Sequence, residues 1–83
     1  MDTDEEIVHR VRGGENVLFE QLMRRHNERV YRAACAILHD RSEAEDVMQD
    51  AYVRAYEHLD DFEGRSLFST WLVKIAVYEA LAR

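Results

Sequence analysis

Proline is missing from this chain of 83 residues, and glycine occurs only at positions 13, 14 and 64. These two residue types interrupt helices most often, so their scarcity favours long, continuous helices. The length is sufficient for one domain with one hydrophobic core, covering residues 1–83. A hydrophobic content of 47% is ordinary for a globular protein and too high for a disordered one.

Cysteine is almost as rare as proline. The single Cys35 excludes an internal disulfide and any metal site rich in cysteine, and its alanine-rich surroundings favour a small buried side chain over a reactive thiol. The four histidines do not fall at catalytic or metal-binding spacings with this cysteine or with carboxylates. We therefore expect no enzymatic activity, no metal and no cofactor.

Signals for export and for membrane insertion are not apparent in the sequence. The N-terminal residues are acidic, whereas a signal peptide begins with basic residues, and no apolar run approaches about 18 residues. A single unpaired cysteine agrees with a reducing compartment. We expect a cytoplasmic protein that does not span a membrane.

Basic residues are outnumbered, and the net charge of −6 by itself argues against a nucleic-acid partner. The charges are, however, distributed unevenly. Residues 24–41 carry five arginines and two acids, residues 42–63 eight acids and one arginine, and residues 64–83 three basic residues and one acid. An acidic block between two basic ones suits a domain that holds a basic protein and an anionic polymer on different faces.

The first half of the chain is predicted to form two helices. A short helix covers about residues 4–12 and ends at Gly13-Gly14. A long amphipathic helix follows over about residues 15–39, where apolar residues recur at steps of three and four. Four arginines lie on its opposite face and add nonspecific attraction for DNA if DNA is a partner: Arg24, Arg25, Arg29 and Arg32.

The second half is predicted to form two further helices. The third covers residues 43–59 and begins at a capping box, in which Ser42 is the N-cap and Glu45 reaches back to its amide. The fourth covers residues 70 to about 82, is apolar on nearly every side, and has Ser69 as its expected N-cap. The expected fold class is all-α: a small helical bundle of three main helices plus a short N-terminal helix.

The exposed face of the third predicted helix is acidic. At about 100° per residue, the positions opposite its apolar stripe are Asp46, Gln49, Asp50, Val53 and Glu57. On charge alone, a solvated face is the more common explanation. A valine among the charges and the uneven signs favour a basic partner helix instead, and the residues by themselves leave both explanations open.

The predicted loop over residues 60–69 and the start of the last helix combine aromatic, hydroxyl and basic side chains. Aromatic rings can stack on unpaired bases, and hydroxyls, amides and basic groups can bind base edges or phosphate. For Phe62 and Trp71, burial in the core beneath the loop is the simpler explanation. For the polar residues, composition does not decide between the two: Arg65, Ser66, Ser69 and Lys74.

Two long motifs cover these two segments: AEDVMQDAYVRAY at residues 44–56 and FEGRSLFSTWLVKIA at residues 62–76. They resemble the AED-hydrophobic-hydrophobic-Q-[ED]-x-[FY]-x-[RK]-A-[WY] and F-x-G-x-S-x-F-S-T-W-L-x-[RK]-I-A motifs in region 2 of extracytoplasmic-function (ECF) sigma factors, a branch of the sigma-70 family. The likeness extends from about Phe19 to the C-terminus. Two such motifs in the right order and at the right spacing are far more specific than one short pattern. The resemblance implies a region 2 domain, and the region 4 domain of that family is expected to be absent from this chain.

The resemblance also implies partners. In that family, the helix that matches residues 43–59 docks on the clamp coiled coil of core RNA polymerase, which implies polymerase contacts by Asp46, Gln49, Asp50, Val53, Arg54 and Glu57. The family's loop and last helix bind the promoter −10 element as single-stranded DNA with a flipped base, and so help to melt it. This implies DNA contacts by Arg65, Ser66, Phe68, Ser69, Thr70, Lys74 and Tyr78. An anti-sigma factor that masks these surfaces is a further expected partner.

Tyr78 departs from the family pattern, which usually has asparagine two residues beyond the Ile-Ala pair. Asparagine can bond a base edge bidentately, whereas tyrosine mainly stacks and offers one hydroxyl, so we do not expect the family's −10 sequence preference to transfer unchanged. Two other functions are compatible with a small helical domain of this kind. One is a helical protein-interaction module without a DNA role. The other is a homodimeric regulator of duplex DNA, which would need a basic recognition helix that the last two predicted helices do not provide.

Overall fold

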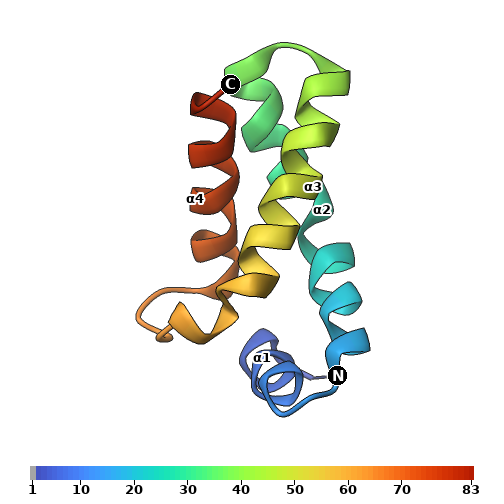
Figure 1. Ribbon diagram of the computed structural model, residues 1–83, viewed down its shortest axis with the longest axis vertical. Coiled ribbons are helices and arrows are strands. Elements are labelled where there is room, and N and C mark those ends of the chain that lie inside the picture. Colours follow the sequence, from blue (N-terminus) through green and yellow to red (C-terminus); the bar gives the residue numbers. More distant parts are fainter. Residues whose placement is uncertain (1) are drawn as a thin grey trace.

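Helices form nearly all of the protein in the computed structural model, which describes residues 2–83. Three long helices lie side by side along the long axis, and the short first helix lies across one end of them (Figure 1). In chain order the elements are α1 Asp4–Arg12, the 3-10 turn η1 Asn16–Leu18, α2 Phe19–Leu38, α3 Arg41–Glu57, the 3-10 turn η2 Leu59–Asp61, and α4 Phe68–Leu81. The predicted all-α class and helix count are confirmed.

Helix α1 forms as the sequence predicts, and polar contacts attach it to α2. The Thr3 hydroxyl accepts a hydrogen bond from the Glu6 amide at 3.1 Å and so caps the N-terminus. The Asp4 carboxylate accepts one hydrogen bond from Arg25 at 3.1 Å and lies 2.8 Å from a ring nitrogen of His26. The inner face of α1 is buried through Ile7, Val8 and Val11. The N-terminal helix is therefore an integral part of the bundle.

The start of α3 differs from the predicted capping box. His39 ends α2 in the left-handed conformation, with φ 56°, and the chain then extends at Asp40. The Asp40 carboxylate accepts a hydrogen bond from the Glu43 amide at 2.9 Å, so Asp40 is the N-cap and the Ser42 prediction is wrong. Ser42 lies inside the first turn because the reversal at His39 brings the chain into helical geometry two residues earlier.

Helix α4 also begins earlier than predicted. It starts at Phe68, the N-cap position is Leu67 without a side-chain cap, and Ser69 lies within the first turn. The Ser69 side chain is buried, and its hydroxyl accepts a hydrogen bond from Arg29 of α2 at 3.1 Å. Ser69 is therefore not the N-cap. Burial of the Phe68 ring explains the difference, since it brings this residue into the helix and against the core.

The core follows the predicted apolar faces. The sequence predicts a third helix that reaches residue 59, but α3 ends at Glu57 and Leu59 begins η2. The predicted apolar stripe of this helix is half-buried at Met48 and buried at Ala44, Val47, Ala51, Tyr52, Ala55 and Leu59. Many of these residues are alanines, which allow α2, α3 and α4 to pack closely. Near α1 the core is aromatic instead. There the rings of Phe62, Phe68 and Trp71 lie 5.4–5.7 Å apart, so the prediction that Phe62 and Trp71 close the core is confirmed.

Candidate functional site

The acidic face of α3 points to solvent. The predicted set of Asp46, Gln49, Asp50, Val53 and Glu57 is exposed throughout, and Val53 is 58% exposed. Val53 is therefore an apolar side chain that is more than half exposed within an acidic row. Such a row can bind a helix that presents basic residues around an apolar one.

Two residues of α3 make ion pairs with the C-terminal part of the chain. Asp50 accepts a hydrogen bond from Arg83 at 2.9 Å, and Arg54 forms an ion pair with Glu79 of α4. Both pairs are at least partly exposed, so each contributes little to stability. They nevertheless place the exposed face of α3 directly beside α4.

An open apolar depression borders the acidic face between α2 and α3. It is lined by Met23, Gln49, Tyr52, Val53, Tyr56 and Glu57. Tyr52 forms its floor, because its ring is buried and its hydroxyl donates to the Asn27 side chain. Burial raises the pKa of Tyr52 to about 12, which keeps the hydroxyl protonated as a donor. The depression gives a partner helix an apolar surface next to the acids.

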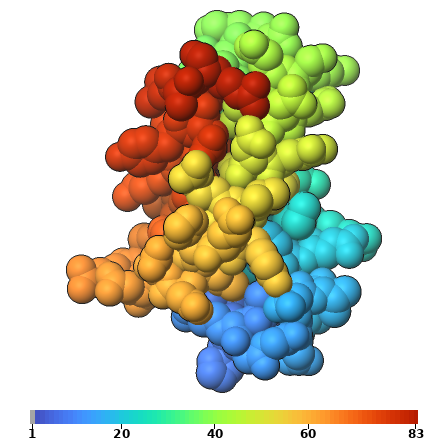
Figure 2. All heavy atoms as spheres, viewed as in Figure 1, coloured from blue at the N-terminus to red at the C-terminus, as the bar shows by residue number. Residues whose placement is uncertain are grey.

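The connecting loop, residues 62–67, projects from the side of the molecule (orange in Figure 2). It is shorter than predicted because residues 60 and 61 belong to η2 and residues 68 and 69 to α4. Its residues 63–67 are exposed, and Leu67 is 64% exposed. Gly64 has φ 77°, a conformation that residues with a Cβ rarely adopt. The loop thus offers main-chain and side-chain groups to solvent in a defined bend.

The predicted DNA contacts divide into an exposed group and a buried pair. Arg65, Ser66, Thr70, Lys74 and Tyr78 are exposed. Thr70, Lys74 and Tyr78 are spaced by four residues, so they form one row along α4, and Tyr78 is 75% exposed. This row continues from the connecting loop, so the five side chains can form one surface.

Phe68 and Ser69 do not belong to this surface. Phe68 is 1% exposed inside the aromatic cluster, and Ser69 is 5% exposed and bonded to Arg29. A side chain removed from solvent cannot contact DNA without leaving the core. In this structure both side chains anchor the start of α4, so DNA contact by Phe68 and Ser69 stays a prediction that requires them to leave the core.

The arginines on α2 are largely engaged within the protein. Three are paired with carboxylates: Arg24 with Glu20, Arg25 with Asp4, and Arg32 with Glu28. Arg29 donates to Ser69, as described above. These contacts reduce the positive field that α2 presents. The connecting loop and the row on α4 are therefore the better-supported site for binding an anionic partner.

Arg12 is a residue that sequence reasoning did not single out. Its guanidinium donates to the main-chain oxygens of Leu59, at 2.6 Å, and of Phe62. The two contacts join residues that are separated by 47 and by 50 positions in the sequence. Such contacts leave no periodic signal in the sequence, so only the structure could reveal them.

Metal sites and membrane spans are the other site classes on which the described residues bear. Among residues 2–83, no group of three or more His, Cys, Asp or Glu side chains could hold a metal ion. None of the helices within that span is long and apolar enough to cross a membrane. Cys35, the free cysteine, is half-buried beside the smaller core cluster, in agreement with a packing role.

The fold and these two exposed surfaces define a small helical domain with an acidic face and a basic-aromatic face on neighbouring helices. The sigma-70 region 2 family matches residues 22–83, which include all of α3 and α4 and most of α2. The chain belongs to this family.

Named sigma factors are similar to the chain. It is 35% identical over 79 residues to the RNA polymerase sigma-H factor of Pseudomonas aeruginosa, a match that covers 95% of this chain and 41% of that protein. It is 37% identical over 78 residues to the ECF RNA polymerase sigma-E factor of Escherichia coli K12, covering 94% of the chain and 40% of the relative. It is 33% identical over 69 residues to the ECF RNA polymerase sigma factor SigW of Bacillus subtilis, a match that covers 83% of this chain and 37% of that protein. The chain thus spans about two fifths of the length of these relatives.

Proposed function

We propose that this chain is the part of an ECF-type RNA polymerase sigma factor that binds core polymerase and recognises the promoter −10 element during transcription initiation. The observation that carries the proposal is the division of the surface. The acidic face of α3 and the row on α4 with its loop are both exposed, belong to helices that pack against each other, and differ in chemistry. The domain can therefore hold two partners at once.

The polymerase contact is assigned to α3. Asp46, Asp50 and Glu57 supply negative charge, Val53 supplies an apolar contact, and Gln49 and Arg54 supply hydrogen bonds. The partner that fits is a basic coiled coil, and the clamp of core RNA polymerase is the one that the family implies. Charge complementarity would speed the encounter, and the apolar depression would supply area for close contact.

The DNA contact is assigned to the connecting loop and the row on α4. Arg65 and Lys74 attract phosphate, Ser66 and Thr70 offer hydroxyls, and Tyr78 presents an exposed ring on which a base can stack. Taking a base out of the duplex costs a few kcal/mol, which contacts to the extruded base offset. This surface therefore favours the single-stranded −10 element over closed duplex DNA.

An anti-sigma factor is the second protein partner that we propose. Tyr78 and Leu81 leave α4 with exposed apolar side chains, at 75% and 66%. An inhibitor that covers them would also cover the DNA row on the same helix. A protein with these partners acts in the cytoplasm, where it works as an adaptor and not as an enzyme.

The polymerase assignment is tested by charge reversal. We expect Asp50→Arg to abolish retention of core polymerase in a pull-down, because like charges that face each other cost several kcal/mol. Glu5→Arg on α1 is the matched control, with the same change of charge away from α3, and should retain polymerase normally. Normal retention by Asp50→Arg would remove α3 from the polymerase interface.

The DNA assignment is tested through salt dependence. Each phosphate contact to a single strand contributes a slope of about 0.7 to the plot of log affinity against log salt. Arg65→Ala combined with Lys74→Ala should lower that slope by about 1.4. Arg10→Ala combined with Arg41→Ala removes the same charge elsewhere and should leave the slope unchanged. An unaltered slope in the first variant would move the DNA surface to another face.

A further inference from the structure

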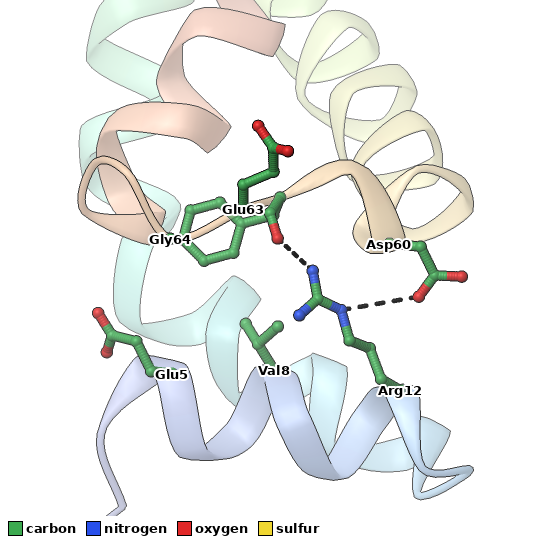
Figure 3. A pocket seen from close by; sticks show the side chains of 7 residues that line it. Glu5, Val8, Arg12, Asp60, Glu63 and Gly64 are labelled. Carbon is green, nitrogen blue, oxygen red and sulfur yellow. Dashed lines mark hydrogen bonds and ion pairs between the residues drawn. The ribbon is translucent and has the colours of Figure 1, made fainter.

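Arg12, at the end of α1, contacts the segment that leads into the connecting loop. Figure 3 shows its guanidinium reaching up from α1 between Asp60 and the main chain near Glu63. The Nη2 atom donates to the Leu59 oxygen at 2.6 Å and to the Phe62 oxygen, and Nε lies 3.6 Å from an Asp60 carboxylate oxygen. The Arg12 side chain is 33% exposed, whereas that of Asp60 is 92% exposed, so the main-chain contacts dominate.

These contacts satisfy main-chain groups at the end of η2. A helical turn leaves carbonyl oxygens at its C-terminal end without helical partners. The Leu59 oxygen accepts from the Phe62 amide at 3.1 Å, and Arg12 supplies a second donor to it and a donor to the Phe62 oxygen. Both bonds come from the single Nη2 nitrogen, which carries two N–H groups, while Nε of the same rigid plane faces Asp60.

The connecting loop has few internal contacts that could set its shape. Within it, the Ser66 hydroxyl donates to the Leu67 oxygen at 3.3 Å, and Arg65 lies 3.5 Å from Glu63. At its far end, burial of Phe68 fixes where the chain enters α4. The direction of the loop is therefore set mainly by its two ends, of which Arg12 holds the first.

We propose that Arg12 is a positioning residue for the DNA-binding loop: it fixes the main chain at Leu59 and Phe62, so that Arg65 and Ser66 are presented beside the row on α4. The hydrogen bonds of Arg12 support the positioning of the loop, and the effect on DNA binding rests on the proposed function. Arg12 lies outside residues 22–83, which the family matches. The N-terminal helix thus contributes to DNA recognition without touching DNA.

The variant that tests this inference is Arg12→Ala, with Arg10→Ala as the matched control. Arg10 lies on the same helix, and its partners are Asp2 and Glu15, away from η2. We expect amide hydrogen exchange at Asp61 and Phe62, which are bonded within η2, to accelerate by about tenfold in Arg12→Ala. Affinity for labelled single-stranded oligonucleotides of varied sequence should fall by about tenfold, while retention of core polymerase stays within about twofold.

Each outcome decides a separate question. Arg12→Lys keeps the charge and one donor nitrogen but loses the Nε contact with Asp60 and the rigid plane that orients the donor, so it should restore only part of the affinity and of the exchange protection. Unchanged exchange at Asp61 and Phe62 in Arg12→Ala would refute the positioning role. An equal loss of polymerase and DNA binding would indicate general destabilisation and would refute it as well. If the unaltered chain binds no single strand, the proposed function fails, and the exchange data still decide whether Arg12 holds η2.

Discussion

Replacing Phe68 with leucine distinguishes a core residue from a DNA contact at this position. Phe68 is 1% exposed, and its ring lies 5.5 Å from Phe62 and 5.7 Å from Trp71. Complete truncation of such a residue to alanine costs about 3–5 kcal/mol. Leucine retains most of the apolar volume but loses these two aromatic contacts, each worth about 0.5–1.5 kcal/mol, so we expect a loss of about 1–3 kcal/mol. A domain of this size has about 4–12 kcal/mol of stability, so the variant remains folded.

The assay combines urea unfolding with titration of single-stranded DNA under conditions where the variant is folded. Phe68→Leu should lower the unfolding midpoint while its DNA affinity stays within about twofold of the unaltered chain. Thr70→Ala is the reciprocal control: Thr70 is exposed on the DNA row, so its stability should change by less than about 0.5 kcal/mol while affinity falls. If Phe68→Leu keeps full stability and loses DNA binding, the burial argument is refuted and Phe68 contacts DNA directly.

Three further predictions concern local structure. Asp40→Ala should cost about 1 kcal/mol in urea unfolding, whereas Ser42→Ala should cost almost nothing; the reverse order would restore Ser42 as the cap. Gly64→Ala should lower thermal stability by about 1 kcal/mol because φ is 77°, and an unchanged melting temperature would contradict this conformation. Burial raises the pKa of Tyr52 to about 12, whereas that of a tyrosine in the unfolded chain is about 10. The resulting stability is fully present below about pH 10 and is lost as the pH rises through about 12. Tyr52→Phe should remove this part of the alkaline loss of stability in unfolding titrations, and an unchanged dependence on pH would contradict the burial of the hydroxyl.

The sequence predicted best what depends on local periodicity. The bounds of α1, the number of helices and the buried face of α3 follow from apolar spacing and from the glycine pair, which act within a few residues. The caps were harder, because Asp40 and Ser42 both suit an N-cap. The choice between them depends on the left-handed conformation of His39. Residues other than glycine adopt this conformation rarely, so the sequence gives little sign of it.

The candidate site shows the same division. Exposure of the acidic face of α3 follows from its helical period, and so does the row of Thr70, Lys74 and Tyr78. The burial of Phe68 and Ser69 depends instead on how α4 packs against α2 and on the cluster beneath the loop. The contacts of Arg12 join segments about 50 positions apart, and no local pattern encodes such a meeting.

The ion pairs between α3 and the end of the chain place any cationic partner of Asp50 in competition with Arg83. A basic coiled coil that takes the Asp50 carboxylate releases this tether on the last residues beyond α4. By thermodynamic reciprocity, a ligand that holds those residues in place weakens binding of the coiled coil, and the coiled coil weakens binding of that ligand by the same factor. Binding at the acidic face of α3 and ordering of the residues after α4 are therefore coupled, so that each affects the other.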